Sequence, residues 1–415
     1  MNLSPLAITE VPTRLRTFAK TRTADFWLFE SSLWLHVFAS SLISIFIPVL
    51  LLSNGFTVQS VFLFYIFYHG FNIPANYLGR FITRRFSAKT SIILGTISTI
   101  IFFLLYSGVE TMGLLVMIAF FYALYDGLYY VPSLYLFMNS TKDPENTGEN
   151  TGILHLVTRS AGLVGPILGS ILVIASGGNR TVVVAVMVLF FIFSLIPLFF
   201  LKELEKGEPE KPISWKEFFS NRRERKNHQS FALYKISEAA ELIIFPMFIF
   251  LTFEDLSSVA ILAVLIPIVS LVFSYAASHI KRTQREKIIM IGAAALAAVW
   301  FARFLIDSQI MFYATNVLTG LFALFILVPL DANMFLRGAE RGALSASMFR
   351  NISSMGAKLL LFIVLFILVN NFYIPFAVAF IALLGLIYVN YAYLEWRERQ
   401  PGSQTSVVGL PTKND

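Results

Sequence analysis

Long apolar segments separated by short polar ones run along the whole chain. A helix that spans a bilayer needs about 20 consecutive, mostly apolar residues. Twelve stretches meet that length, at roughly 28–53, 57–79, 88–108, 112–138, 151–176, 181–201, 229–253, 257–279, 287–306, 309–336, 342–369 and 372–395. The pattern therefore predicts an all-α integral membrane protein with twelve transmembrane helices.

The twelve segments fall into two groups of six, separated by a charged stretch. The expected organisation is a cytoplasmic N-terminal tail (1–27), a first six-helix bundle (28–201), a cytoplasmic central loop (202–228), a second six-helix bundle (229–395) and a disordered, cytoplasmic C-terminal tail (396–415). In the central loop, Ser214 and Glu217 have the spacing of a capping box. That spacing predicts either a short interfacial helix or a plain linker with one helical turn.

The two groups resemble each other. A short basic turn follows the second helix of each group, with Arg84 and Arg85 in the first and Lys281 and Arg282 in the second. The fifth helix of each group has a glycine near its start and an arginine seven or eight residues later. We therefore expect two six-helix bundles related by a pseudo-twofold axis, as in transporters built from parallel repeats.

Composition supports a membrane protein and excludes several other classes. Hydrophobic residues make up 57% of the chain, charged residues 14%, and the mean hydropathy is +0.72, whereas a soluble domain is about a quarter charged. Cysteine is absent, which excludes disulfides and thiolate sites. No zinc-binding or phosphate-binding motif occurs. We expect neither an enzyme nor a cofactor.

The positive charges are distributed unevenly along the chain. Of the 32 Lys and Arg, 26 lie in the tails and in the loops on the same side as the tails. This bias predicts that both termini face the cytoplasm, and we expect a multi-pass protein of the bacterial inner membrane. The bias also explains the net charge of +7 without a nucleic-acid partner.

The fifth predicted helix carries a glycine- and proline-rich motif, formed by Gly162, Gly165, Pro166 and Gly169. Proline bends a helix because it lacks a backbone donor, and small residues let helices approach closely. With the six-plus-six pattern and the basic turns, this motif resembles the major facilitator superfamily, in particular its drug:proton antiporters. The resemblance covers about residues 28–395 and implies a secondary transporter that works by alternating access, usually as a monomer.

Three positions depart from the pattern of that family. Arg84 and Lys281 stand where the family carries an aspartate in its basic turns. The arginine expected in the fourth helix is missing, and the local sequence there is Tyr125-Asp126-Gly127. The resemblance nevertheless implies that the basic turns and the glycine-proline motif act in gating and bending.

Charged and titratable residues inside the spans are candidates for function, because a charge in the middle of a bilayer costs at least about 2.5–3.5 kcal/mol. The candidates are His36, His69, Asp126, His155, Arg159, Lys235, Glu238, Glu241, Asp331, Arg350 and Lys358, together with Asn333 beside Asp331. The third, sixth, ninth and twelfth helices carry charges only near their ends. In the family these helices are peripheral and the others surround a central cavity.

Several of these candidates have two possible roles. Asp126 and Arg159 could approach each other as a substrate or proton site, or as a structural ion pair. Glu238 and Glu241 share a helix face and could carry a coupling proton, unless Lys235 neutralises Glu238.

The remaining candidates are less tightly constrained by the sequence. His36 and His69 could titrate near neutral pH or only pack. Lys358 is expected to line a cavity, and Arg350 to be structural. Tyrosines such as Tyr125 would give the cavity an aromatic wall.

Two functions fit this sequence. The first is proton-coupled efflux of a small organic or amphipathic solute, with protons as the coupling ion. The second is import or uniport of a zwitterionic or anionic nutrient, since buried cations balance buried carboxylates.

Overall fold

The computed structural model describes residues 24–140, 147–175, 180–202, 213–278, 280–368 and 373–399. These residues form helices and connecting turns, with no strand among them. The helices are α2 (Ala24–Ser41), η1 (Ser44–Phe46), α3 (Ile47–Ser53), α4 (Val58–Arg85), α5 (Ala88–Tyr106), α6 (Met112–Ser140), α7 (Thr147–Ala175), α8 (Arg180–Phe200), α9 (Trp215–Phe218), α10 (Arg222–Ala239), the π-helix η2 (Ala240–Ile244), α11 (Phe245–Phe253), α12 (Leu256–Ser278), η3 (Arg282–Gln284), α13 (Arg285–Ala302), α14 (Gln309–Arg341), α15 (Ala343–Leu368) and α16 (Tyr373–Glu398). The predicted disordered tail from 400 onward and most of the N-terminal tail lie outside the described residues.

Two of the twelve predicted spans are broken helices. The first consists of α2, η1 and α3, and the seventh of α10, η2 and α11. Within the described residues, nine spans are long and apolar enough to cross a bilayer. The other three are α4, which carries His69, Asn72 and Asn76, α13, which begins with three charged residues, and α12, whose described apolar part is short.

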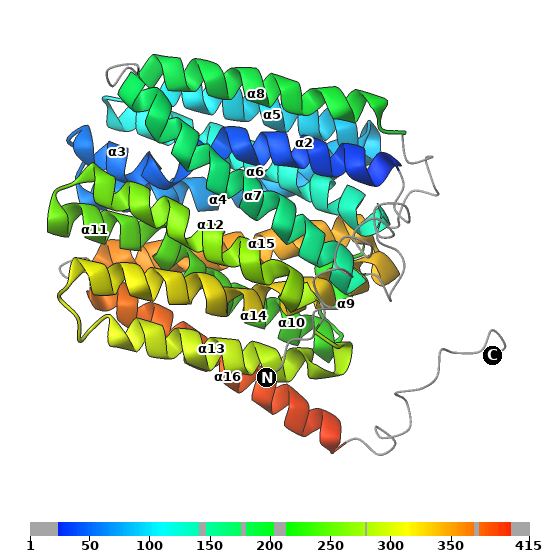
Figure 1. Cartoon of the computed structure of the whole chain (residues 1–415). Coiled ribbons are helices and arrows are strands. Elements are labelled where there is room, and N and C mark those ends of the chain that lie inside the picture. Colours follow the sequence, from blue (N-terminus) through cyan, green and yellow to red (C-terminus); the bar gives the residue numbers. More distant parts are fainter. Residues whose placement is uncertain are drawn as a thin grey trace, which may run out of the picture.

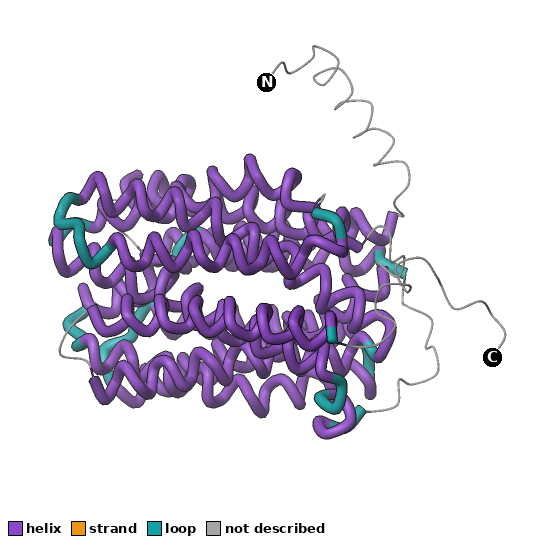
Figure 2. Tube along the Cα trace, turned by 90° about the horizontal axis from the view of Figure 1, so that it is seen from below, coloured by secondary structure: helices purple, strands orange, loops and turns teal. Residues whose placement is uncertain are grey.

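The helices lie side by side with their axes roughly aligned, in two groups (Figure 1). Helices α2 to α8 form one half and α10 to α16 the other (Figure 1), and the view from below also shows the helices running side by side (Figure 2). The halves meet where α4 and α6 pack on α15 and where α7 packs on α12 and α14. This is the predicted all-α membrane fold of two six-helix bundles.

The first and last described residues lie at the same end of the molecule, on the right of Figure 1. α4 also ends there, with the exposed side chains of Arg84 and Arg85. We call this the basic end. Lys281 and Arg282 are exposed in the equivalent turn of the second half.

Side-chain caps fix where several helices begin. Ser214 accepts a hydrogen bond from the backbone N–H of Glu217 at 3.2 Å, which confirms the predicted cap of α9. Asn221 caps α10 through the N–H groups of Arg223 and Glu224. α10 therefore begins at Arg222, seven residues before the predicted start of this span, because a strong cap outweighs the polar composition of its first two turns.

Glycines allow two close helix contacts that position the cavity. A Cβ on Gly127 of α6 would lie 2.5 Å from the backbone carbon of Ala75 on α4. A Cβ on Gly165 of α7 would collide with Ser41 at the end of α2, and a Cβ on Gly169 would collide with Leu42, the next residue. Two glycines of the glycine-proline motif therefore let α7 pack closely against the end of α2, as small residues do in membrane helices.

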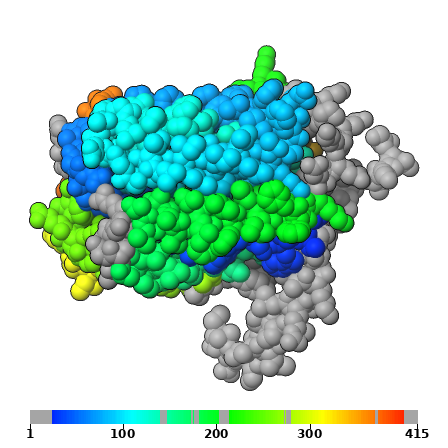
Figure 3. Space-filling view, turned by 90° about the horizontal axis from the view of Figure 1, so that it is seen from above, coloured from blue at the N-terminus to red at the C-terminus, as the bar shows by residue number. Residues whose placement is uncertain are grey.

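Apolar side chains cover the outside of the bundle. Figure 3 shows one such face, where α5 and α8 lie side by side. Exposed residues on these helices include Ile97, Leu104, Ile192 and Phe199. Such a surface suits contact with lipid tails.

Candidate functional site

A cavity of about 540 Å³ lies between the two halves. Its walls come from α2 and η1, α4, α6 and α7 on one side and from α10, η2, α12, α14 and α15 on the other. Among the described residues, none from α5, α8, α13 or α16 lines it. The charge pattern of the sequence correctly predicted which helices are peripheral.

Charges from both halves line the cavity. The carboxylates are Asp126, Glu238 and Asp331, and the cations are Arg159, Lys235, Arg350 and Lys358. With the histidines neutral, four cations face three carboxylates. The cavity is therefore a charged chamber with a small positive excess, enclosed by an apolar shell.

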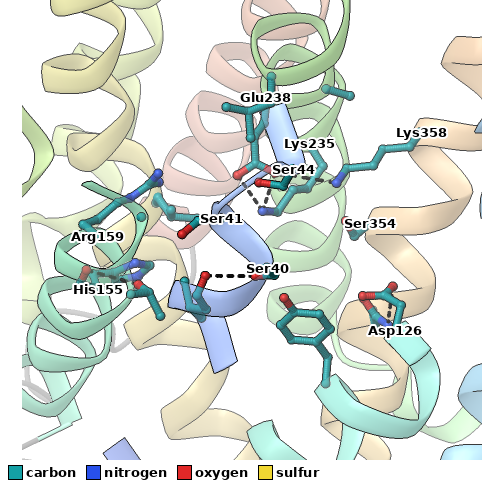
Figure 4. A pocket seen from close by; sticks show the side chains of 18 of the residues that line it. Ser40, Ser41, Ser44, Asp126, His155, Arg159, Lys235, Glu238, Ser354 and Lys358 are labelled. Atoms are coloured by element: carbon teal, nitrogen blue, oxygen red, sulfur yellow. Dashed lines mark hydrogen bonds and ion pairs between the residues drawn. The ribbon is translucent and has the colours of Figure 1, made fainter. Parts of the chain in front are cut away.

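Glu238 is neutralised by two lysines. Lys235 Nζ lies 2.8 and 2.7 Å from the two carboxylate oxygens of Glu238, and Lys358 Nζ lies 3.7 Å from Oε2. Figure 4 shows the three side chains meeting in the cavity. Lys358 thus has a partner that the sequence did not identify. Of the two predicted roles for Glu238, the structure agrees with neutralisation by Lys235.

Asp331 links the two halves of the protein. Arg350 Nη2 and Nε donate to Asp331 Oδ1 at 2.6 and 3.1 Å. From the other half, His155 Nε2 lies 3.2 Å from Asp331 Oδ2. The guanidinium of Arg350 also lies over the ring of Phe231, 4.3 Å from its centre. Arg350 is therefore held by the protein itself.

Asp126 and Arg159 do not form the predicted pair, and they lie on separate sides of the cavity (Figure 4). Asp126 Oδ2 instead accepts from Asn72 Nδ2 at 2.5 Å and from Asn351 Nδ2 at 3.4 Å. The prediction failed because α6 packs against α4, α5 and α15 and not closely against α7, so that amides on α4 and α15 reach Asp126.

The amides around Asp126 form a network across the interface. Asn76 Nδ2 donates to Asn72 Oδ1 at 2.5 Å, and Asn351 Nδ2 donates to Asn76 Oδ1 at 2.8 Å. α4 and α6 belong to the first half and α15 to the second. These hydrogen bonds therefore join the halves, and separating the helices would break them.

Arg159 has no such partner. No hydrogen bond or ion pair joins its guanidinium to any residue that the structure describes, although it lies in the cavity wall (Figure 4). Within the described part of the cavity, it is the one cation without a carboxylate within 4 Å.

Three predicted site residues lie outside the cavity wall. Glu241 pairs with Arg303, whose Nη1 and Nη2 lie 2.6 and 2.9 Å from its oxygens. His36 is fully buried and its Nε2 is 3.0 Å from Tyr125 Oη. Asn333 accepts from Arg285 Nη1 at 3.1 Å. Each faces a neighbouring helix, so burial of these polar groups reflects packing within one half.

Other predicted residues do line the cavity. His69 lies in its wall, with Nδ1 3.2 Å from the sulfur of Met355. Tyr125, Gly162 and Pro166 also line it. Tyr125 therefore lines the cavity and also contacts His36.

Sequence reasoning missed several polar groups that the fold brings together. Asn72, Asn76 and Asn351 were missed because a neutral amide inside a span is a weak signal unless, like Asn333, it lies beside a charged residue. Glu30 was missed because it lies two residues after the predicted start of its span. It is 2% exposed, and neither carboxylate oxygen has a hydrogen-bond partner.

The halves contact each other beyond both ends of the cavity. At the basic end, Arg80 Nη2 donates to Ser345 Oγ at 3.0 Å, and Met138 of α6 packs against Gly338 of α14. At the opposite end α3 packs on α11. Two bundles that enclose a charged central chamber and meet at both of its ends have the geometry of a transporter.

Comparison with known proteins agrees with this geometry. A sequence model of the Major Facilitator Superfamily matches residues 31–357. The chain belongs to the major facilitator superfamily. It is therefore a multi-pass membrane transporter with the fold of a secondary transporter, and not an enzyme.

Solved structures of other superfamily transporters share the fold. The human organic anion transporter MFSD10 (TETRAN) is 13% identical, with a TM-score of 0.67 over 88% of this chain and 99% of that one. A bacterial homologue of the iron transporter ferroportin, in an outward-facing state, is 13% identical, with a TM-score of 0.69 over 90% of this chain and 100% of that one. A search of curated protein sequences finds no match.

Proposed function

We propose that this major facilitator transporter carries a small organic anion or zwitterion by alternating access through the central cavity. The observation that carries this proposal is Arg159, a cation in the cavity wall that has no carboxylate within 4 Å among the described residues. A guanidinium that faces the cavity without an internal counter-ion is available to an anionic group of the solute. A carboxylate or phosphate on the solute would supply the missing partner, in the bidentate geometry that arginine prefers.

The rest of the cavity suits the body of such a solute. Its volume of about 540 Å³ falls within the range typical of small-molecule sites. Tyr65, Tyr68, Tyr122 and Tyr130 contribute aromatic rings to the wall. The Glu238–Lys235–Lys358 cluster lies in the same chamber and offers both signs of charge to a zwitterion.

Uptake into proteoliposomes tests this proposal. Organic anions, zwitterions and cations of similar size are offered to the wild type, to Arg159→Gln and to Arg397→Gln, which removes an exposed arginine at the end of α16. We expect anions or zwitterions to be carried by the wild type and Arg397→Gln, and only weakly by Arg159→Gln. Transport of cations alone, or full activity in Arg159→Gln, would contradict the proposal.

A second candidate function is proton-coupled efflux of an amphipathic solute. Asp126 favours it, because this carboxylate lies in the cavity wall with amide partners and no cation within 4 Å among the described residues. Glu238 and Glu241 are weaker candidates for coupling, since both are ion-paired. Solute accumulation that requires a pH gradient in the wild type, and fails in Asp126→Asn, would support this function; accumulation without a gradient would contradict it.

We also propose that the basic end faces the cytoplasm of a bacterial cell. The excess of Lys and Arg in the loops at this end supports that orientation. A cysteine introduced at the exposed Thr283 tests it in intact cells. Labelling by an impermeant maleimide only after lysis is expected, and labelling of intact cells would reverse the assignment.

A further inference from the structure

One buried carboxyl group in the spans differs from all the others described. Glu238 and Asp331 are ion-paired in the cavity, and Glu241 is ion-paired with Arg303. Asp126 accepts hydrogen bonds from two amides. Glu30 has neither, since both of its oxygens are buried and without a hydrogen-bond partner.

Apolar side chains surround Glu30 on α2. Phe26, Phe29 and Leu33 occupy neighbouring positions on the same buried side of the helix, and all are nearly inaccessible. Phe29 and Leu33 also line the cavity. Glu30 therefore lies directly beside the cavity wall, with almost no exposed surface.

No cation reaches Glu30 from the helices that pack against α2, which are α6, α7 and α8. Among the ionisable groups on these helices, Tyr129 on α6 lies within electrostatic range of Glu30, and α7 carries Glu149, His155 and Arg159. His155 is occupied by Asp331, and Arg159 forms no ion pair with a described residue.

The remaining neighbours offer no counter-ion either. The segment Thr181–Phe200 of α8 has no titratable side chain. On α2 itself, Asp25 accepts from the backbone N–H of Lys202 at 3.2 Å, and His36 bonds to Tyr125. Among the residues that the structure describes, Glu30 thus meets one weakly acidic tyrosine and forms no ion pair with a cation.

An ionised carboxylate without donors or cations is strongly disfavoured in such surroundings, whereas the protonated acid carries no net charge. We propose that Glu30 is a proton-binding site, occupied while the basic end is closed and emptied when that end opens. This inference rests on transport by alternating access and is independent of the solute class. It assigns the coupling proton to α2, and not to the paired glutamates of the seventh span.

The position of Glu30 explains why opening would release the proton. Glu30 is six residues after the first residue of α2, or about 9 Å along the helix axis, and therefore near the basic end. The contacts that close this end are Arg80 with Ser345 and Met138 with Gly338. Once they separate, water reaches the α2 wall and can solvate an ionised Glu30.

Spin-label distances across the basic end test this coupling. The chain has no cysteine, so labels attach only at Phe86→Cys and Thr283→Cys, two exposed positions on opposite halves. In the wild-type background we expect the ratio of open to closed molecules to rise with pH, by up to about tenfold per pH unit for one linked proton. With Glu30→Gln, which imitates the protonated acid, the closed distance should persist at every pH.

Infrared spectroscopy tests the proton itself. A protonated carboxylic acid has a carbonyl band that an ionised carboxylate lacks. Subtracting the Glu30→Gln spectrum from that of the wild type at neutral pH should reveal this band. The matched variant Glu238→Gln removes an ion-paired carboxylate and should leave the band in place.

The possible outcomes separate clearly. An unchanged pH response of the distances in Glu30→Gln, or a missing acid band in the difference spectrum, overturns the proposal. If Glu30→Gln does not fold, the wild type alone is followed as the pH rises. Loss of its acid band at the pH at which the basic end opens supports the proposal. A band that persists through opening overturns it. Neither readout involves an organic anion, so failure of the proposed solute class would leave both results intact.

Discussion

The pair formed by Glu241 and Arg303 offers the sharpest test of whether a carboxylate in the seventh span is structural or functional. The sequence predicted Glu241 as a coupling residue on the same face as Glu238. In the structure Glu241 lies in the π-helix η2, in the first turn after α10. This wider turn and the three-residue offset direct Glu241 toward α13 and α14, while Glu238 faces the cavity.

The geometry sets the size of the effect expected from Glu241→Gln. Arg303 is fully buried and donates to both oxygens of Glu241. Asn316 adds a third donor at 2.9 Å, and the guanidinium lies over Phe245 at 3.8 Å from the ring centre. Removing one partner of such a pair leaves a buried charge without compensation, which costs about 3–5 kcal/mol. We expect Glu241→Gln to lower stability by that amount.

Thermal unfolding in detergent measures the stability of each variant, and a transport assay on the folded fraction measures its function. Glu241→Gln should unfold well below the wild type. The double variant Glu241→Gln with Arg303→Met should recover much of the loss, because the uncompensated charge is gone. Glu238→Gln is the matched control. It should alter transport more than stability, since its partners Lys235 and Lys358 lie beside a cavity that water can enter.

One result would refute this reasoning. If Glu241→Gln unfolds at the wild-type temperature and abolishes pH-driven transport, Glu241 is a coupling group and the ion pair with Arg303 contributes little to stability.

Three further predictions rest on contacts in the cavity wall and between helices. Arg159→Gln should weaken the binding of a carried anion by about 10- to 150-fold, because a hydrogen bond to a charged group contributes about 1.5–3 kcal/mol; equilibrium binding measures this. The affinity of Arg159→Lys should fall between those of the wild type and Arg159→Gln, because lysine keeps the charge but not the bidentate geometry. Asn351→Ala should shift the spin-label distances toward opening of the basic end by about 1–3 kcal/mol, and unchanged distances would show that the amide network does not hold the halves together. Gly127→Ala should lower stability by about 1–3 kcal/mol, because its Cβ would lie 2.5 Å from Ala75, whereas Gly162→Ala, with open space around it, should unfold like the wild type.

Much of the fold could be predicted from the order of apolar and charged residues along the chain. The length and apolarity of each segment are local properties, and a bilayer accepts only helices with satisfied backbone groups. The charge pattern also separated the cavity-lining helices from the peripheral ones, because a charge in the spans is tolerated only where it meets a partner or water. Local signals such as Ser214 with Glu217 specified a helix start to the residue.

Partnerships across helices could not be predicted in this way. Asp126 was expected to meet Arg159 because both lie on consecutive helices, but Asn72 of α4 reaches it first. Lys358 had no visible partner in the sequence, yet it lies 3.7 Å from Glu238, which is 120 residues away. Which of several polar groups meet depends on the rotation and crossing of helices, and those are set by the packing of small residues such as Gly127.

Hydropathy and charge along the chain were therefore enough to identify a helical membrane protein and to predict twelve spans in two related halves. Only the tertiary structure shows which partner each buried charge meets. It pairs Glu241 with Arg303 and Glu238 with two lysines, and among the described residues it leaves Arg159 without an ion-pair partner and Glu30 without a hydrogen-bond donor. The physical reason is that the cost of a buried charge depends on atoms within a few ångströms, and in a helical bundle most of those atoms come from other helices.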